Sequence, residues 1–331
     1  MKDIFEYKDN FSLNADIQSK LLLGNPDLNR NPKISIIIPT YKRPELLKSA
    51  LESCLKQDFK EVYEILVVDN NDDPEYNKNF EIVKSLNDPR ILYYRNDKNL
   101  GMSGNWNRGI ILSRGKNITF CHDDDQLLPY SLSLLNKLSE QNPGKAIFAS
   151  HNTINEEGKI INKAVIPSRL NKIFKPLNPF EYKKWDVFLC SPGFGCGCLF
   201  NRKNMIELGG FNEEFYPSFD YAFNALYVFT FGGVYSLTPT FNYRIFANES
   251  MTAYKKFADV DRHFRACMAK RMNTPKWILN KLIDSKYNVS KVNFAINWGK
   301  ESKELLKTVK VSDKVIDRIS KRLITFKRGR L

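Results

Sequence analysis

Short apolar runs alternate with segments of helical periodicity through the first half of the chain. The runs at residues 33–38, 64–68, 91–94 and 116–121 are rich in β-branched or aromatic side chains. A run that is apolar on both faces is typical of a strand buried in a parallel sheet. After the first run, Pro44 is suited to the first turn of a helix whose apolar residues recur every three or four positions. This alternation predicts an α/β fold with a doubly wound, mostly parallel sheet and helices on both faces.

The same reading places further elements along the chain. Helices are expected at residues 17–23, 75–86, from the polar loop 99–109 to about 113, and at 130–140, 201–210 and 221–231. One more strand is expected at 146–149, and the polar, proline-containing segment 155–185 predicts irregular chain.

Polar side chains follow three of the predicted strands. Thr40, Asp69 and the acidic run Asp123–Asp125 each come just after a strand. In open parallel sheets, ligands bind outside the carboxyl ends of the strands, near the point where the strand order reverses. We therefore expect one edge of the sheet to collect these residues.

The acidic run predicts a metal site. Three adjacent carboxylates repel one another unless a cation or water screens them. Mg²⁺ and Mn²⁺ prefer oxygen ligands and often bind one or two carboxylates together with substrate phosphates. A metal–diphosphate site at Asp123–Asp125 is thus one interpretation, and a solvated Asp-rich turn is the other. Structural alternatives also exist for two other acids: Asp69 is compatible with a turn residue, and Asp220 is compatible with the N-cap of the helix at 221–231.

Composition narrows the class of protein. The 331 residues are 42% hydrophobic and 13% aromatic, as in globular proteins. We expect a cytosolic protein, because no apolar run is long enough to span a bilayer and the charged N-terminus lacks the apolar core of a signal peptide. The six cysteines are expected to be reduced. Cys196 and Cys198 have no second cysteine pair at zinc spacing, so no metal role is predicted for them.

Charge is concentrated at the C-terminus. The net charge is +14, and residues 251–331 hold 21 of the 51 Lys and Arg but only 7 of the 37 Asp and Glu. Such a region suits an anionic membrane surface, an anionic acceptor or nucleic acid. Its apolar clusters predict two to four amphipathic helices, which either lie on a membrane or pack on the main domain with a solvated basic face.

Four ordered motifs resemble those of the family 2 glycosyltransferases with the GT-A fold. They are Ile-Ile-Ile-Pro39-Thr40-Tyr41-Lys-Arg43, Val-Val-Asp69-Asn70, Asn99-Leu-Gly101 with Asn107-Arg-Gly109, and Asp123–Asp125 with Pro129. The later residues Gly210-Phe-Asn-Glu-Glu, Asp220 and Tyr243-Arg244-Ile also match, so the resemblance covers about 33–250. It implies an extension (1–32), a catalytic domain (33–250) and a basic helical region (251–331). Within the catalytic domain, 33–129 would be the nucleotide-binding half and 130–250 the acceptor half.

The resemblance also implies an activity. It is the metal-dependent, inverting transfer of a hexose or related sugar from a UDP-sugar or dTDP-sugar to a glycan or lipid-linked saccharide, by single displacement with Mn²⁺ or Mg²⁺. Position by position, the implied nucleotide-binding residues are Pro39, Thr40, Tyr41, Arg43, Asp69, Asn99, Gly101, Asn107, Asp123 and Asp124. Asp125 and Asp123 would ligate the metal, and Asp220 would be the catalytic base.

The chain departs from the family pattern at three positions. His122 stands where many relatives have the first Asp of the metal motif, which leaves the ligand open between Asp123 and Asp125. Phe219 replaces the Glu that usually precedes the base, and Phe246 stands where some relatives carry a metal-contacting His. The Gln-x-x-Arg-Trp motif of the processive polymerases is not found.

Two other classes are considered. A nucleotidyltransferase normally has a Gly-rich loop with Lys or Arg after the first strand, and residues 39–43 are not such a loop. A nucleic-acid-binding protein would use the basic C-terminal region, whose aromatics instead have core-like spacing. Metal-dependent binding of UDP would distinguish the transferase from the nucleic-acid binder, which would bind DNA or RNA without UDP.

Overall fold

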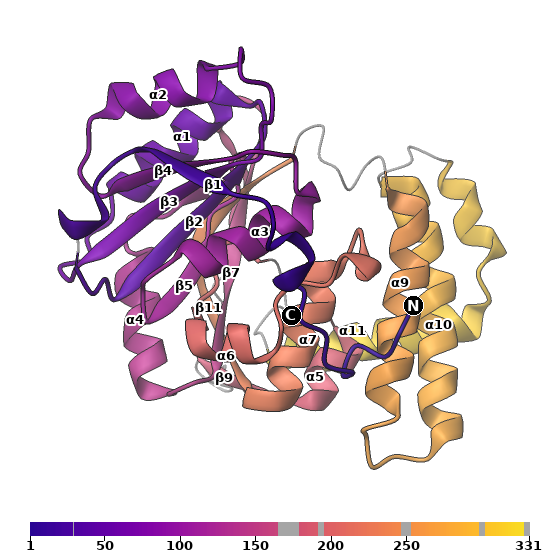
Figure 1. Ribbon diagram of the computed structural model, residues 1–331. Helices are drawn as coiled ribbons and strands as arrows, with labels where there is room; N and C mark the ends of the chain where they lie inside the picture. Colours follow the sequence, from indigo (N-terminus) through magenta and orange to yellow (C-terminus); the bar gives the residue numbers. More distant parts are fainter. Residues whose placement is uncertain (29, 165–178, 191–194, 246–252, 298–301, 328–331) are drawn as a thin grey trace.

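The computed structural model describes the chain except residues 29, 165–178, 191–194, 246–252, 298–301 and 328–331. An α/β part and a group of C-terminal helices lie side by side (Figure 1). The fold predicted from the sequence is confirmed: a mostly parallel sheet has helices on both faces, and the basic C-terminal region is helical.

The larger sheet has the strand order β1-β4-β3-β2-β5-β10. Its strands, in that order, are Ser19–Leu23, Ile91–Asn96, Tyr63–Asp69, Ile34–Thr40, Asn117–Phe120 and Phe200–Asn201. The four central strands are parallel, and β1 and β10 pair with them antiparallel. Every residue of β2 and β3 is buried, as their apolar sequences require.

The strand order reverses at β2. From β2 the chain passes outward through β3 to β4, then returns to place β5 on the other side of β2. Thr40 at the end of β2 is paired in register with Asp69 at the end of β3, and Ile37 with Phe120 at the end of β5. The residues after these strands therefore meet at one edge, as expected.

A second sheet has the order β6-β11-β7-β8, with β9 also paired to β11. Its strands are β6 (Gln126–Leu127), β7 (Ala146–Ile154), β8 (Ile160–Asn162), β9 (Phe180–Tyr182) and β11 (Gly233–Arg244). Strand β6 directly follows the acidic run and pairs with the last residues of β11, Asn242 opposite Gln126. This pairing brings Arg244 to the acidic run.

Helices cover both faces of the larger sheet. In the α/β part they are α1 (Pro44–Leu55), α2 (Lys78–Leu86), α3 (Gly101–Leu112), α4 (Ser131–Gln141), α5 (Lys184–Leu189), α6 (Arg202–Glu207) and α7 (Phe219–Phe231), with 3₁₀ turns η1 (Ser12–Asn14), η2 (Pro26–Leu28) and η4 (Glu213–Phe215). Alternate residues of β2 enter two apolar clusters. Ile36 belongs to the cluster that contains residues of α1 and α4, and Ile37 to the cluster that contains residues of α3 and α7.

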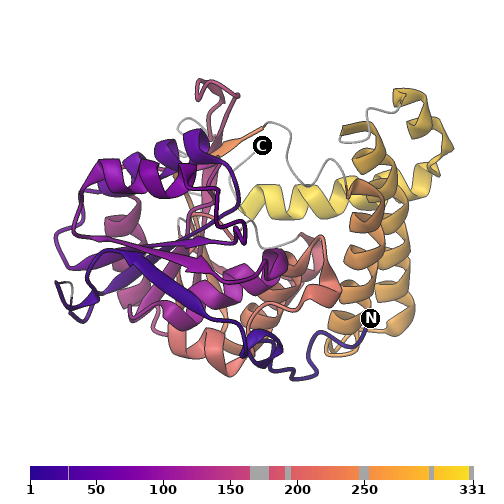
Figure 2. The same ribbon diagram turned by 45° about the horizontal axis from the view of Figure 1, so that its top comes forward.

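The C-terminal region forms α9 (Tyr254–Ala269), α10 (Lys276–Asn297), η5 (Lys303–Thr308) and α11 (Val311–Lys327). Helix α10 packs against both α9 and α11, and α11 also contacts α5 (Figure 2). Ile4 shares an apolar cluster with Phe264 of α9, and Asp3 pairs with Arg271 at 2.9 Å. No helix in the described part of the chain is long and apolar enough to cross a membrane. The division at residues 32 and 250 stays a prediction.

The prediction of irregular chain at 155–185 is wrong for part of that segment, since β8, β9 and the start of α5 lie within its described residues. Three further elements differ from those expected. The helix predicted at 17–23 is instead the edge strand β1, because backbone pairing with β4, Leu21 opposite Tyr94, outweighs a weak local pattern. The predicted loop 99–109 is helical from Gly101 onward, and the helix α3 packs against β2 and β3. The approach is close, because a side chain at Gly109 would clash with Ile37 of β2. Strand β11 was not predicted, and the irregular register around Pro239 explains why its alternation is obscure.

A buried ion pair anchors the end of α3 to the sheet, and its loss should destabilise the fold. Glu64 of β3 is fully buried and accepts hydrogen bonds from the backbone N–H and Nε of Arg114, at 2.8 and 2.9 Å. We expect Arg114→Ala to lower the free energy of unfolding by about 3 kcal/mol, because it leaves a buried carboxylate uncompensated. Urea denaturation measures this. In the control Arg30→Ala, which removes an exposed pair with Asp27, the loss should stay below about 0.5 kcal/mol. Equal losses would contradict the assignment.

Candidate active site

A cavity of about 490 Å³ opens at the edge where β2, β3 and β5 end. Its wall comes from seven parts of the chain: the end of β2 with the residues after it, the residue after β3, the start of α3, the acidic turn, the start of α7, the end of β11, and α9. The residues that line it are Pro39, Thr40, Tyr41, Arg43, Asn70, Asn99, Gly101, Met102, Asn105, Trp106, His122, Asp123, Asp124, Tyr216, Pro217, Phe219, Asp220, Tyr221, Tyr243 and Phe257.

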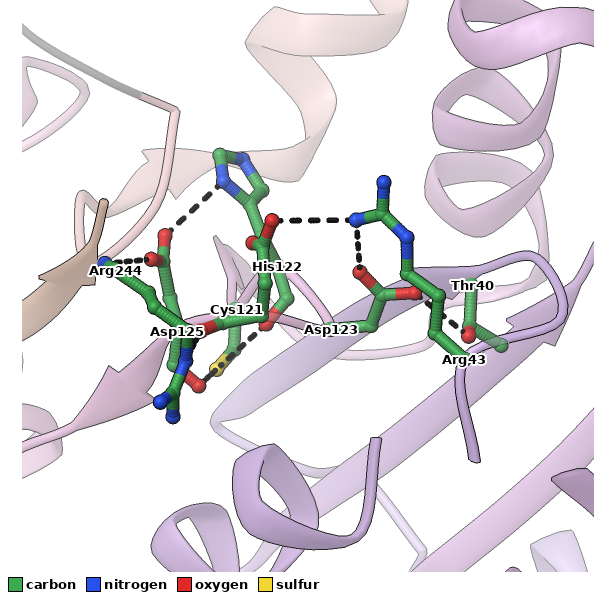
Figure 3. Close-up of polar contacts among 8 residues, drawn as sticks. Thr40, Arg43, Cys121, His122, Asp123, Asp125 and Arg244 are labelled. Atoms are coloured by element: carbon green, nitrogen blue, oxygen red, sulfur yellow. Dashed lines mark hydrogen bonds and ion pairs between the residues drawn. The ribbon is translucent and has the colours of Figure 1, made fainter. Parts of the chain in front are cut away.

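The acidic run lies on this cavity and is held by β2 and the residues after it. Asp123 Oδ2 accepts a 2.8 Å hydrogen bond from Thr40 Oγ1 (Figure 3). The Arg43 guanidinium lies 3.4 Å from Asp123 and 3.2 Å from Asp124. Asp123 is only 6% exposed. The run is therefore not a solvated turn, because its charges have specific protein partners.

Asp125 lies beneath the cavity lining. It is buried, and its Oδ1 accepts a 2.9 Å hydrogen bond from the backbone N–H of Arg244. Its Oδ2 is 3.2 Å from His122 Nδ1, while Arg244 Nε donates to the carbonyl of Asp124 at 2.7 Å. Asp125 and Arg244 thus fasten the acidic turn to β11 (Figure 3).

Burial shifts the titration of these groups. It raises the pKa of Asp123 to about 7, with the neighbouring charge of Asp124 adding to the rise and Arg43 opposing it. Burial likewise raises the pKa of Asp125 to about 6 against the opposing effect of His122. For His122, burial alone would lower the pKa, but hydrogen bonding to Asp125 and the nearby carboxylates raise it to about 9.

The donor atoms fit a hard divalent cation. Asp123 and Asp124 present carboxylate oxygens to the cavity, the ligand type that Mg²⁺ and Mn²⁺ prefer. A second group, His122, Asp125 and Cys196, has one potential ligand atom from each residue, all within 4.8 Å of one another. No metal role was predicted for Cys196. Its position between glycines in the sequence does not indicate that it lies close to His122 and Asp125.

A network of asparagines shapes the end of the cavity near β3 and β4. Asn70 donates to Asn99 Oδ1 at 2.7 Å and to the carbonyl of Gly101 at 3.2 Å. Asn96 of β4 donates to Asn70 and Asn105, at 3.0 and 2.9 Å. Asn70 and Asn105 were not predicted as nucleotide-binding residues, although Asn70 belongs to one recognised motif and Asn105 lies between the two parts of another.

Two predicted nucleotide-binding residues do not line the cavity. Asp69 is fully buried and accepts hydrogen bonds from Tyr93 and from the backbone N–H of Asn71. Burial raises its pKa, and these hydrogen bonds oppose the rise. Asn107 bridges the backbone N–H and carbonyl of Phe211, both at 2.8 Å. Both side chains are hydrogen-bonded to residues that do not line the cavity, and their role in nucleotide binding stays a prediction.

Asp220 faces the cavity from the first turn of α7. It is the second residue of the helix, whose N-cap position is Ser218, so the N-cap interpretation of Asp220 is wrong. Burial raises its pKa to about 6, opposed by the backbone N–H of Tyr221 and the charge of His122. Phe219, where a Glu was expected by resemblance, packs edge-on against Trp106.

Aromatic side chains complete the wall beside Asp220. Tyr216, Tyr221, Tyr243 and Phe257 line the cavity and were not predicted as site residues. Tyr216 and Tyr221 come from the loop before α7 and from α7 itself, Tyr243 from β11 and Phe257 from α9. All four are distant in sequence from the acidic turn, so no local pattern identifies them. Phe246, one of the departures from the family pattern, lies outside the described residues.

Known proteins resemble this chain in sequence and in fold. The family model described as glycosyl transferase family 2 matches residues 35–209. A GalNAc(5)-diNAcBac-PP-undecaprenol β-1,3-glucosyltransferase of Campylobacter jejuni is 35% identical over 188 residues, 56% of each chain. The Escherichia coli UDP-Glc:α-D-GlcNAc-diphosphoundecaprenol β-1,3-glucosyltransferase WfgD is 28% identical over 175 residues, 47% of this chain and 67% of WfgD.

The chain thus spans about half the length of the first of these relatives. Among solved structures, Staphylococcus aureus TarS 1–349 in complex with UDP-GlcNAc aligns with a TM-score of 0.59 at 15% identity, covering 89% of this chain and 81% of TarS 1–349. At this identity the similarity establishes the fold alone.

The position of Asn107 leads to a test that separates structural support from ligand contact. We expect Asn107→Ala to lower the free energy of unfolding by about 2 kcal/mol, because two buried backbone groups of Phe211 lose their partner. Its affinity for UDP, measured by calorimetry, should change less than that of Asn105→Ala, which removes a cavity-lining side chain from the same helix. A larger loss of UDP affinity in Asn107→Ala would mean that Asn107 contacts the nucleotide.

Proposed function

Because the chain belongs to glycosyl transferase family 2, we propose that it is a metal-dependent inverting glycosyltransferase. Its donor would be a UDP-sugar, or a dTDP-sugar, and its acceptor a glycan or lipid-linked saccharide. One observation supports the proposal: a single cavity of about 490 Å³ is lined by the carboxylates of Asp123 and Asp124, by the amides of Asn70, Asn99 and Asn105, and by the carboxylate of Asp220. The chemistry needs these three parts together, because a diphosphate must leave while an acceptor hydroxyl attacks from the other side.

Asp123 and Asp124 are the residues that would hold Mn²⁺ or Mg²⁺, since they carry the acidic oxygens of this turn that face the cavity. The cation would neutralise the negative charge that develops on the departing diphosphate. Asp125 would then act one layer below, where its bonds to Arg244 and His122 keep the turn in place. The earlier assignment of Asp125 as a direct ligand is thereby replaced in this proposal by a supporting role.

The recess bordered by Asn70, Asn99 and Asn105 would receive the nucleotide. Amide side chains both donate and accept hydrogen bonds, as recognition of a uracil or thymine edge requires. Pro39, Thr40 and Tyr41 form the neighbouring wall. Arg43, which the acidic turn holds at 3.2–3.4 Å, lies where it could also contact the diphosphate.

Asp220 would accept the proton of the acceptor hydroxyl as that oxygen attacks the anomeric carbon. With a pKa of about 6, its carboxylate is deprotonated at neutral pH and is nevertheless more basic than an exposed Asp. Attack from the face opposite the leaving diphosphate inverts the anomeric centre. Tyr216, Tyr221 and Phe257 would bound the acceptor, since sugar rings pack on aromatic faces.

The relatives support a lipid-linked acceptor, because two of them are named for sugars carried on undecaprenol diphosphate. We accordingly place the enzyme in the cytoplasm, at the inner face of the cell membrane, with residues 251–331 toward anionic lipid. Neither a nucleotidyltransferase nor a nucleic-acid-binding protein is favoured, because the matched family is one of glycosyl transferases.

The proposal predicts that UDP binding depends on a divalent cation. Calorimetry should give at least tenfold tighter UDP binding with Mn²⁺ than with EDTA, because a cation held by Asp123 and Asp124 would attract the negatively charged diphosphate. Asp124→Asn should remove most of this difference. Asp27→Asn, which changes an exposed acid, should leave it intact. Metal-independent UDP binding in the unmodified chain would refute the metal site.

The sugar donor can be identified by a separate thermal-shift screen of UDP-sugars and dTDP-sugars with Mn²⁺, because a bound donor raises the apparent stability of the protein.

Asp220 can be tested as the base. Asp220→Asn should slow transfer to a diphosphoundecaprenol-linked saccharide by roughly 10²-fold or more while UDP affinity stays within about threefold. In the unmodified enzyme, kcat should fall as the pH drops through about 6, because Asp220 becomes protonated below its raised pKa. Asp27→Asn again serves as control. Transfer at an unchanged rate by Asp220→Asn would remove this residue from the mechanism.

A further inference from the structure

Helix α11 turns polar side chains inward. Asp313, Asp317 and Ser320 are each less than 10% exposed. These three residues lie on one face of the helix because they are separated by three or four positions. Inward-facing acids are unusual for a surface helix, which normally buries its apolar stripe.

Specific contacts with α10 hold this orientation. The Asp313 carboxylate accepts hydrogen bonds from Ser285 Oγ and Asn288 Nδ2, both at 2.8 Å. The Asp317 carboxylate lies 3.6 Å from Nζ of Lys286, and both side chains are less than 10% exposed. Rotating α11 about its axis would strip these buried groups of their partners, which is strongly unfavourable. The outward face of α11 is therefore determined by its inward face.

The outward face carries a row of three apolar side chains. Val311, Val315 and Ile319 are 75%, 46% and 54% exposed, and their spacing of four residues aligns them along one side of the helix. We call these three residues the α11 stripe. Val311 is the most exposed large apolar side chain in the described part of the chain. Scattered exposed apolar residues are ordinary, but an aligned row opposite a buried polar face requires a reason.

Basic side chains accompany the stripe. Lys314 and Arg318 lie within α11 at positions adjacent to the stripe in the helical turn, and Arg318 is exposed. The surrounding region, 251–331, has three times as many Lys and Arg as Asp and Glu, 21 against 7. An apolar row with basic neighbours is complementary to a surface that is apolar inside and anionic outside, which is the interface of an anionic bilayer.

We propose that α11 docks on an anionic lipid surface, with the α11 stripe entering the headgroup boundary and Lys314 and Arg318 contacting lipid phosphates. The helix connects to the cavity through few steps: α11 packs on α10, α10 packs on α9, and Phe257 of α9 lines the cavity. Docking by α11 would thus hold the cavity at a fixed distance from the membrane. This inference concerns lipid binding alone and does not depend on the transfer reaction.

The test uses the full chain and flotation with two kinds of vesicle, phosphatidylcholine alone and phosphatidylcholine mixed with phosphatidylglycerol. The chain should float with the mixed vesicles and be released by high salt. For the variant Val311→Ser/Val315→Ser/Ile319→Ser, partitioning onto the mixed vesicles should be at least roughly tenfold lower, because the apolar contact is lost. Lys314→Gln/Arg318→Gln should reduce partitioning roughly fivefold for each charge removed.

A matched control removes three exposed aliphatic side chains elsewhere. Leu13, Leu28 and Val62 are 55%, 63% and 47% exposed in the α/β part, and their replacement by Ser should leave flotation unchanged. Equal flotation of the stripe variant and this control would overturn the proposal, as would failure of the unmodified chain to float. Self-association in sedimentation that only the stripe variant abolishes would assign the stripe to a second copy of the chain instead.

UDP affinity is measured in parallel on every variant. The stripe variant should keep the UDP affinity of the unmodified chain, because α11 does not line the cavity. Loss of flotation with intact UDP binding supports lipid docking by α11. Absence of UDP binding in all chains, with normal flotation, would contradict the proposed transferase and leave the lipid inference standing.

Discussion

The immobilisation of three adjacent carboxylates is the constraint on which the site depends. Asp123 and Asp124 are compensated from the β2 side by Thr40 and Arg43, whereas Asp125 is bound from β11. Adjacent like charges would otherwise drive the turn apart or into solvent. Because the partners come from both sheets, the turn keeps its place only when the two sheets are joined, and the cavity forms at that junction.

The two sides of the cavity are built differently. On one side, the asparagine network joins β3, β4 and α3 through direct hydrogen bonds, so its shape follows from the sheet. On the other side, Asp220 enters from α7 and aromatic residues enter from β11 and α9. If the two sides bind donor and acceptor as proposed, relatives could change acceptor without changing the nucleotide chemistry, because the acceptor side is assembled from later elements.

Buried polar contacts determine the orientation of α11, as they determine the orientation of the acidic turn. The acids at 313 and 317 set the rotation of the helix, and the apolar row is left outside as a consequence. Buried ion pairs contribute little net stability, but they discriminate between alternative packings because each alternative leaves a charge without a partner. Orientation, rather than strength, is therefore the main result of these contacts.

The sequence by itself determined the parallel sheet, the acidic run after β5 and the family. Each of these features depends on short contiguous segments, whose periodicity or residue order can be recognised locally. Only the tertiary structure decided that residues 19–23 join a sheet edge, that Asp123 and Asp124 face the cavity, and that Asp125 lies beneath it. These outcomes depend on partners such as Arg244, far along the chain, and the direction of a side chain in a tight turn follows from those partners rather than from its neighbours in sequence.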